Sequence, residues 1–103
     1  MSKTLTTQNF DNEISTGKVL VDFWASWCGP CRMLSITFDE VMGELEKRNI
    51  TLGKVNVDEE MHLADRFNIQ VIPALLLFID GKLVKRKEGY MGPQELLTFI
   101  NGN

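Results

Sequence analysis

The sequence predicts an α/β fold in which a central mixed sheet of five β-strands is flanked by four α-helices. Two features carry this prediction. Strand-like and helix-like segments alternate along most of the chain, which is typical of parallel strands joined by right-handed helical crossovers. Near the C-terminus, Asp80-Gly81 joins two strand-like segments, and this dipeptide is a strong β-hairpin signal, so the last strands should be antiparallel. The expected order is β-α-β-α-β-α-β-β-α, with helices on both faces of the sheet.

A short strand and a short helix are expected first. Residues 3–6 are predicted to form the strand, and Thr7 to cap a helix in which Phe10 and Ile14 share one face. Gly17 should end this helix, because glycine is the residue most often found just beyond a helix C-terminus.

The central strand and the longest helix follow. Residues 18–24 are almost continuously apolar, as in a strand that is covered on both faces, and Asp22 in its middle is the anomaly. The helix should begin near Cys28. Its inward-facing residues follow the spacing of an amphipathic helix: Leu34, Phe38, Val41, Met42 and Leu45.

The third strand is expected at residues 51–57. Asp58 should then cap a helix that holds Leu63 and Phe67.

The C-terminal part supplies the hairpin and the last helix. Strands are expected at residues 74–79 and from residue 82 to about residue 87. Pro93 fits the first turn of the final helix. The residues of this helix that should face the core are Leu96, Leu97 and Ile100.

The size and composition of the chain exclude several classes of function. The 103 residues fit one domain, residues 1–103, and with 44% hydrophobic and 24% charged residues the composition is that of a soluble globular protein. The net charge of -3, with acids and bases mixed, gives no basic patch for nucleic acid. No apolar run approaches the ~20 residues of a membrane span. The first ten residues lack the apolar stretch of a secretory signal, so a cytoplasmic protein is expected.

The two cysteines, Cys28 and Cys31, lie three positions apart. In a reducing compartment such a pair is metal-binding or catalytic. A zinc site needs about four ligands, and the chain adds only a lone His62 on a separate predicted helix, so no metal is expected. An inert structural disulfide is the other alternative, but it would close a very short loop and contribute little stability.

The segment Trp27-Cys28-Gly29-Pro30-Cys31 lies between the central strand and a helix start, where ligands of open α/β sheets gather. Cys28 falls at the helix N-terminus, where unpaired N–H groups and the macrodipole stabilise a thiolate, the attacking species. Cys31 follows one turn later, close enough to form a disulfide with Cys28, and should lie deeper and resolve a mixed disulfide. Pro30 fits the first helical turn.

Residues 21–33, VDFWASWCGPCRM, resemble the active-site segment of the thioredoxin family. Three further segments match in order and spacing, namely residues 54–58, 72–78 and 80–82, so the resemblance covers nearly the whole chain. It implies the thioredoxin fold and an enzyme that reduces disulfides in protein substrates without a bound cofactor. It further implies recycling by an NADPH-dependent thioredoxin reductase, and a monomer.

The resemblance also implies roles for two charged residues. Asp22 would lie beneath the disulfide and assist proton transfer to and from Cys31, and a carboxylate inside a central strand should have a raised pKa. Lys54 resembles the lysine that pairs with this acid. The alternatives are a satisfied buried acid at Asp22 and a solvated strand lysine at Lys54.

Substrate contacts are implied around the cysteines. Sequence alone favours a trans bond before Pro73, but the family has a cis proline here that faces the cysteines, so a cis bond is predicted. The backbone of Ile72 would then be offered to an extended substrate segment. A flat apolar surface is expected from Trp27, Gly29, Pro30, Ile72, Pro73 and Gly89. Tyr90 stands where the family often has a small residue, and we hypothesise that it touches substrates.

The sequence departs from the family pattern at two positions. Ile36 stands where a helix proline is common, so the helix should keep its hydrogen bonds there, and Ala74 replaces a frequent threonine. Neither change touches the sulfur chemistry.

A binding module that uses the same surface without turnover is the rival function, because a fold alone does not determine function. Disulfide isomerase or oxidant activity is disfavoured, because those relatives usually carry another dipeptide between the cysteines.

Overall fold

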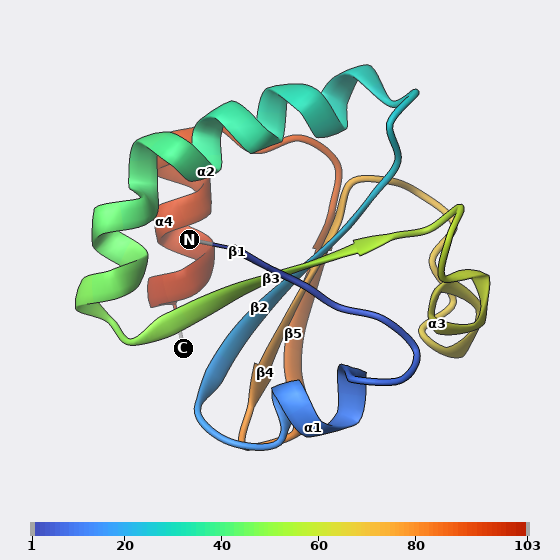
Figure 1. Cartoon of the computed structure of the whole chain (residues 1–103). Helices are drawn as coiled ribbons and strands as arrows, with labels where there is room; N and C mark the ends of the chain where they lie inside the picture. Colours follow the sequence, from blue (N-terminus) through green and yellow to red (C-terminus); the bar gives the residue numbers. More distant parts are fainter. Residues whose placement is uncertain (1, 103) are drawn as a thin grey trace.

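A computed structural model describes residues 2–102 and contains, within that range, the five strands and four helices in the expected order (Figure 1). The elements are β1 (Ser2–Thr4), α1 (Phe10–Ile14), β2 (Lys18–Trp24), α2 (Gly29–Lys47), β3 (Ile50–Asn56), α3 (Met61–Arg66), β4 (Ala74–Ile79), β5 (Lys82–Glu88) and α4 (Pro93–Asn101). The ends of the predicted domain, residues 1 and 103, lie outside the described residues.

The strands form the predicted mixed sheet, and their order within it is β1-β3-β2-β4-β5. β3 runs parallel to both β1 and β2, whereas β4 is antiparallel to β2 and β5 is antiparallel to β4. β2 is the middle strand and is buried over most of its length. Its continuous apolar sequence fits this position, because a strand covered on both faces has no solvent-facing side.

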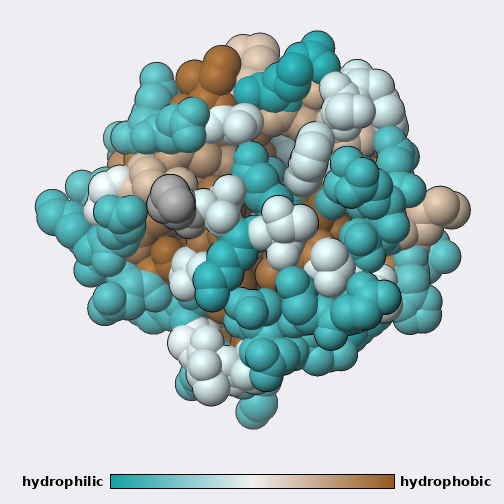
Figure 2. All heavy atoms as spheres, viewed as in Figure 1, coloured by the Kyte–Doolittle hydropathy of each residue, from teal (hydrophilic) through white to brown (hydrophobic). Residues whose placement is uncertain are grey.

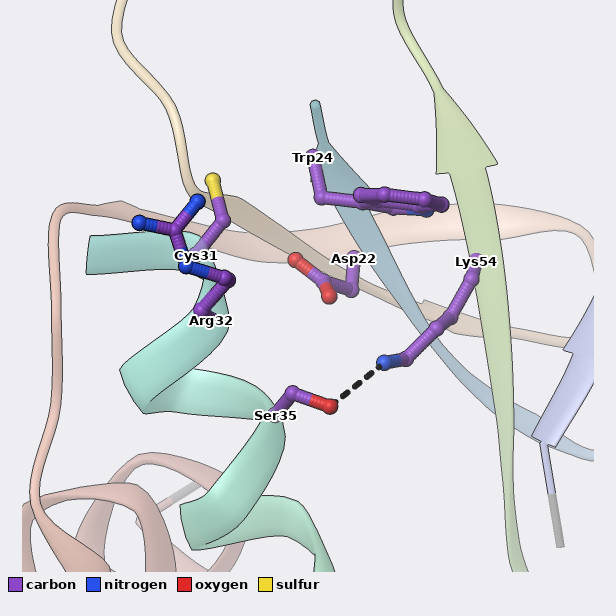
Figure 3. A pocket seen from close by; sticks show the side chains of 6 residues that line it. All are labelled: Asp22, Trp24, Cys31, Arg32, Ser35 and Lys54. Atoms are coloured by element: carbon purple, nitrogen blue, oxygen red, sulfur yellow. Dashed lines mark hydrogen bonds between the residues drawn. The ribbon is translucent and has the colours of Figure 1, made fainter. Parts of the chain in front are cut away.

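Helices cover both faces of the sheet, and the alternation of side chains along β2 separates two cores. Leu20 packs with residues of α2 and α4 on one face, and Val21 packs with residues of α1 and α3 on the other. Asp22 belongs to the face of Leu20, because side chains two apart on a strand point the same way. The Asp22 carboxyl group is therefore directed toward α2 (Figure 3).

The first strand and helix differ from the prediction at their boundaries. β1 ends at Thr4 rather than at residue 6. Thr7 does not cap α1, because its N–H and hydroxyl groups both donate to the Glu60 carboxylate. The reciprocal side-chain-to-backbone pair that opens the helix is formed by Thr6 and Asn9, one residue earlier than predicted (2.8 and 3.2 Å).

The third helix also begins later than predicted. α3 starts at Met61, and Asp58 does not cap it, since the Asp58 carboxylate accepts a hydrogen bond from the Trp27 indole instead. Phe67 lies just beyond the helix end, where its ring still packs against Phe10 and Phe78.

The strongest local signals are confirmed. Asp80 and Gly81 form the turn between β4 and β5 with φ angles of 50° and 86°, a conformation that favours Asp-Gly. α2 continues as one helix through Ile36, as expected without a proline there.

None of the helices described between residues 2 and 102 combines the length and the apolar character needed to cross a membrane.

Candidate functional site

The site begins where β2 leads into α2. Cys28 is the N-cap of the helix, and Gly29 and Pro30 form its first turn, so the ring of Pro30 costs no intrahelical hydrogen bond. The backbone N–H of Cys31 donates to Cys28 Sγ at 3.2 Å. This is the contact expected at a helix N-terminus, where unpaired N–H groups stabilise negative charge on a thiolate.

Cys28 and Cys31 form a disulfide, with their Cα atoms 5.3 Å apart. The sequence predicts that Cys31 is the deeper of the two, but their side chains are almost equally buried, 5% and 4% exposed. Their neighbours differ instead. Cys28 Sγ lies 3.8 Å from the carbonyl oxygen of Ile72, and Cys31 lines an internal pocket with Asp22.

The loop opposite Cys28 carries the predicted cis bond between Ile72 and Pro73. Pro73 is itself buried, and Ile72 is half-buried. The N–H of Gly89 donates to the Pro73 carbonyl at 2.8 Å, which joins the loop after β5 to this segment. The backbone around the cis proline therefore faces the disulfide, as predicted.

The pocket beneath the disulfide encloses about 170 Å³ and lies between β2, β3 and α2 (Figure 3). Asp22 reaches it from β2, Cys31 and Ser35 from α2, and Lys54 from β3 (Figure 3). Trp24 forms one wall. The site thus contains a buried carboxyl group that shares a pocket with Cys31.

Asp22 is 1% exposed, and its Oδ1 has no hydrogen-bond partner among the described residues. Burial raises the pKa of Asp22 to about 7, because a charged carboxylate is poorly solvated there, and the nearby Lys54 ammonium opposes this effect. Asp22 can therefore hold or release a proton near neutral pH, as a proton-transfer group must.

Lys54 lies next to Asp22 on the neighbouring strand, as predicted, but the direct pairing does not occur. The two residues are register partners, yet the Lys54 ammonium donates to Ser35 Oγ at 3.3 Å. It also lies 5.6 Å from the centre of the Phe38 ring. The effect of Lys54 on the carboxyl group is therefore electrostatic and acts without a direct hydrogen bond.

Trp27 lies over the rim of the site and is 67% exposed. Its indole N–H donates to Asp58 Oδ2 at 2.8 Å, which fixes the ring. This role of Asp58 was not among the predictions from the sequence. It could have been found, because β2 and β3 are parallel neighbours and the residues that follow their carboxyl ends meet at one edge of the sheet.

An apolar groove of about 760 Å³ extends from the disulfide along α2. Its lining residues are Gly29, Pro30, Arg32, Met33, Ile36 and Tyr90. The Tyr90 hydroxyl lies 3.4 Å from Thr37 Oγ1, and this contact holds its ring against the helix. Figure 2 shows hydrophobic atoms exposed along the upper edge of the molecule, where α2 lies in Figure 1. The apolar surface predicted from the sequence did not include Met33 and Ile36, although both are apolar residues outside the inward stripe of the helix.

Two further residues considered in the sequence, His62 and Gly89, lie outside the chemistry of the pocket. His62 is exposed on α3, and among residues 2–102 no three His, Cys, Asp or Glu side chains gather as a metal site would require. Gly89 has a φ angle of 91°, a conformation that favours glycine, and lies half-buried beside Tyr90.

Comparisons with known proteins agree with this geometry. The family model named Thioredoxin matches residues 1–102. The chain is 43% identical to the thioredoxin of Chlamydia pneumoniae over 101 residues, 98% of this chain and 97% of that protein. It is 45% identical to the thioredoxin of Alicyclobacillus acidocaldarius over 94 residues, 90% and 89% of the two chains. It is 41% identical to the thioredoxin of Chlamydia caviae over 101 residues, 98% and 97% of the two chains.

Proposed function

The chain belongs to the thioredoxin family and is a protein-disulfide reductase, and from this premise we propose how its residues divide the reaction. It reduces disulfides in protein substrates through reversible oxidation of Cys28 and Cys31. One observation supports the division of roles: Cys28 faces the Ile72 carbonyl group, and Cys31 lines the inner pocket with Asp22.

Cys28 is the nucleophile. Its thiolate lies at the N-terminus of α2, stabilised by backbone N–H groups that include that of Cys31. It attacks one sulfur of the substrate disulfide, and that S–S bond breaks as the new one forms. The other substrate sulfur leaves as a thiolate and takes a proton from water. A mixed disulfide then joins Cys28 to the substrate.

Cys31 resolves the mixed disulfide. Its thiol gives a proton to the Asp22 carboxylate, and the resulting thiolate attacks Cys28 Sγ. The second substrate sulfur leaves as a thiolate and is protonated, so the substrate gains two electrons and the Cys28–Cys31 disulfide forms. Lys54 favours the ionised carboxylate that accepts the proton.

Substrates bind over the rim around Cys28. Two described features support this assignment. Trp27 presents an exposed apolar ring, and no hydrogen bond to another described residue engages the Ile72 N–H, which is left for an extended substrate backbone. The proposed contact residues are Trp27, Gly29, Pro30, Ile72, Pro73, Gly89 and Tyr90.

The cellular setting belongs to the same proposal. Residues 1–103 act as one domain and as a monomer in the cytoplasm, where reducing conditions allow the dithiol form to persist. An NADPH-dependent thioredoxin reductase returns the electrons, which makes the chain an electron carrier. No bound cofactor is needed, because the two cysteines carry both electrons.

Reduction of insulin tests the function directly. With excess dithiothreitol as electron source, the wild-type protein should accelerate insulin reduction well beyond dithiothreitol alone, as followed by precipitation of the freed chains. The double variant Cys28→Ser, Cys31→Ser supplies the baseline. A folded wild type that gives no acceleration would contradict the reductase and favour a binding role for the same surface.

Tyr90→Ala should weaken substrate binding. Loss of a ring that packs against substrate costs on the order of 1 kcal/mol, so kcat/KM for insulin should fall about fivefold. The reaction of the Cys28–Cys31 disulfide with dithiothreitol should stay unchanged, because that small thiol does not reach the groove. Val84→Ala is the matched control, since Val84 is a similarly exposed apolar residue at the opposite end of the sheet. Equal kinetics of Tyr90→Ala and wild type on several protein substrates would remove Tyr90 from the contact surface.

A further inference from the structure

Ser35 occupies a position in the pocket that the reaction described above does not use. It follows Cys31 by four residues on α2, so the two side chains share one face of the helix. Both line the pocket with Asp22 (Figure 3). Ser35 Oγ accepts the hydrogen bond from Lys54 Nζ, at 3.3 Å.

This hydrogen bond determines where the charge of Lys54 lies. Lys54 is the register partner of Asp22, and its flexible four-carbon side chain would allow an ion pair with the carboxyl group. No such ion pair joins the two residues within residues 2–102; the ammonium group points to α2 instead (Figure 3). Among the residues that the structure describes, Asp22 Oδ1 has no hydrogen-bond partner.

We propose that Ser35 is a positioning residue, which holds the Lys54 ammonium away from the Asp22 carboxyl group and so preserves that carboxyl group as a proton carrier for Cys31. The inference rests on the proposed role of Asp22. Without Ser35, Lys54 would close on the carboxylate and hold it in the ionised form. A tightly paired carboxylate is a weaker base and would accept the Cys31 proton less readily.

Among the groups around the Asp22 carboxyl group, Lys54 is the charge that acts on its pKa. On β4 the register partner of Asp22 is Leu75, which is apolar. On α2, Cys31 is held in the disulfide, and Arg32 is exposed at the mouth of the pocket, with one guanidinium N–H donated to the Ser26 carbonyl oxygen at 3.0 Å. Lys54 is the charge that lowers the pKa of Asp22 against the effect of burial.

A titration of Asp22 in the oxidised protein tests the positioning role. With ¹³C-labelled aspartate, the carboxyl carbon of Asp22 reports its ionisation by NMR. In Ser35→Ala, the midpoint should move down by about one pH unit, because an opposite charge within ~4–6 Å lowers a carboxyl pKa by about that much or more. Ser35→Thr keeps the hydroxyl group and should titrate close to wild type. Ala is a good helix former, so the variant should fold.

Lys54→Met separates this effect from other causes. Removal of the ammonium should move the Asp22 midpoint up, and Ser35→Ala should have no further effect in a Lys54→Met background. An unchanged midpoint in Ser35→Ala would overturn the proposal. So would an upward shift, or a shift of the same size in both backgrounds, since each would mean that Ser35 acts on Asp22 without Lys54.

The rate of insulin reduction against pH connects the titration to catalysis. The profile of Ser35→Ala should move to lower pH in parallel with the NMR midpoint. An Asp22→Asn variant with the wild-type profile would refute Asp22 as proton carrier, and thus the proposed mechanism, while the titration would still decide whether Ser35 positions Lys54.

Discussion

Replacement of Cys31 by serine should trap substrate on the protein. Cys28 can still attack a disulfide, but no second thiol remains to release the mixed disulfide, so the covalent complex accumulates. Cys28→Ser should form no complex, because its remaining thiol lines the inner pocket instead of facing the Ile72 carbonyl. Turnover of insulin should fall by about a thousandfold or more in both variants, since each lacks a group that makes or breaks a bond.

Mass spectrometry under non-reducing conditions measures the trapped species. Cys31→Ser mixed with insulin should show one covalent adduct per chain, removed by dithiothreitol. Cys28→Ser is its matched control, with the same number of thiols at the neighbouring position. Adducts of equal yield in both variants would mean that the two sulfurs are equally accessible, and adducts confined to Cys28→Ser would reverse the assigned roles.

The fold could be predicted from the sequence where local signals and burial agree. β2, β4 and α2 have strong apolar patterns, and the turn at Asp80-Gly81 demands residues that tolerate positive φ angles. The errors fall on β1, on β3, which lies one residue earlier than predicted, on the starts of the two shortest helices, and on the end of α1, which lies at Ile14 and not at Gly17. Short elements contain too few residues for periodicity to locate their ends, and partners far along the chain decide them instead.

Two such errors show how distant partners override a capping signal. Thr7 and Asp58 both have the side chains of good helix caps. Thr7 instead donates to Glu60, and Asp58 accepts from Trp27, so each is used in a contact between segments far apart in the sequence. No local pattern contains that information.

The candidate site also has one part that could be predicted from the local sequence and one part that depends on distant contacts. The cysteines and Asp22 were identifiable because they lie in one continuous segment whose chemistry is evident from residue type. The partner of Lys54 was not, because the end of a flexible side chain goes wherever the folded structure offers an acceptor, here Ser35. The Met33 and Ile36 part of the apolar groove was missed because the groove forms only where Tyr90 packs on α2, and Tyr90 lies 53 positions beyond Thr37, which it contacts.

The substitution Asp22→Asn should change the free energy of unfolding of the oxidised protein, relative to the wild type, more favourably at high pH than at low pH. In the folded protein the pKa of Asp22 is raised to about 7, whereas in the unfolded chain it is near its ordinary value of 3.8. Below the unfolded value both states are protonated, and the carboxyl group costs nothing extra. Between the unfolded and the folded value the free energy of unfolding falls, because the unfolded carboxyl group ionises and is solvated while the folded one stays protonated, and above about pH 7 the loss is complete. A difference of about three pKa units corresponds to about 4 kcal/mol.

Denaturant unfolding of the oxidised wild type and of Asp22→Asn, from about pH 4 to about pH 8, measures this difference. The free energy of unfolding of the wild type should fall relative to that of the variant across this range. Comparison between pH values cancels the constant cost of a buried amide in the variant. Parallel curves would show that Asp22 is not buried in the way the structure has it.

The same variant should be a slower reductase, and the two effects together explain why an acid occupies the middle of the sheet. An apolar residue at position 22 would remove the cost of an ionised carboxylate among Leu20, Leu75 and Leu77. It would also leave Cys31 without a nearby group that exchanges protons near neutral pH. Under the proposed mechanism, the stability lost by burying an ionisable group at position 22 accompanies proton transfer at the disulfide, and a variant that gained stability with no loss of rate would contradict that mechanism.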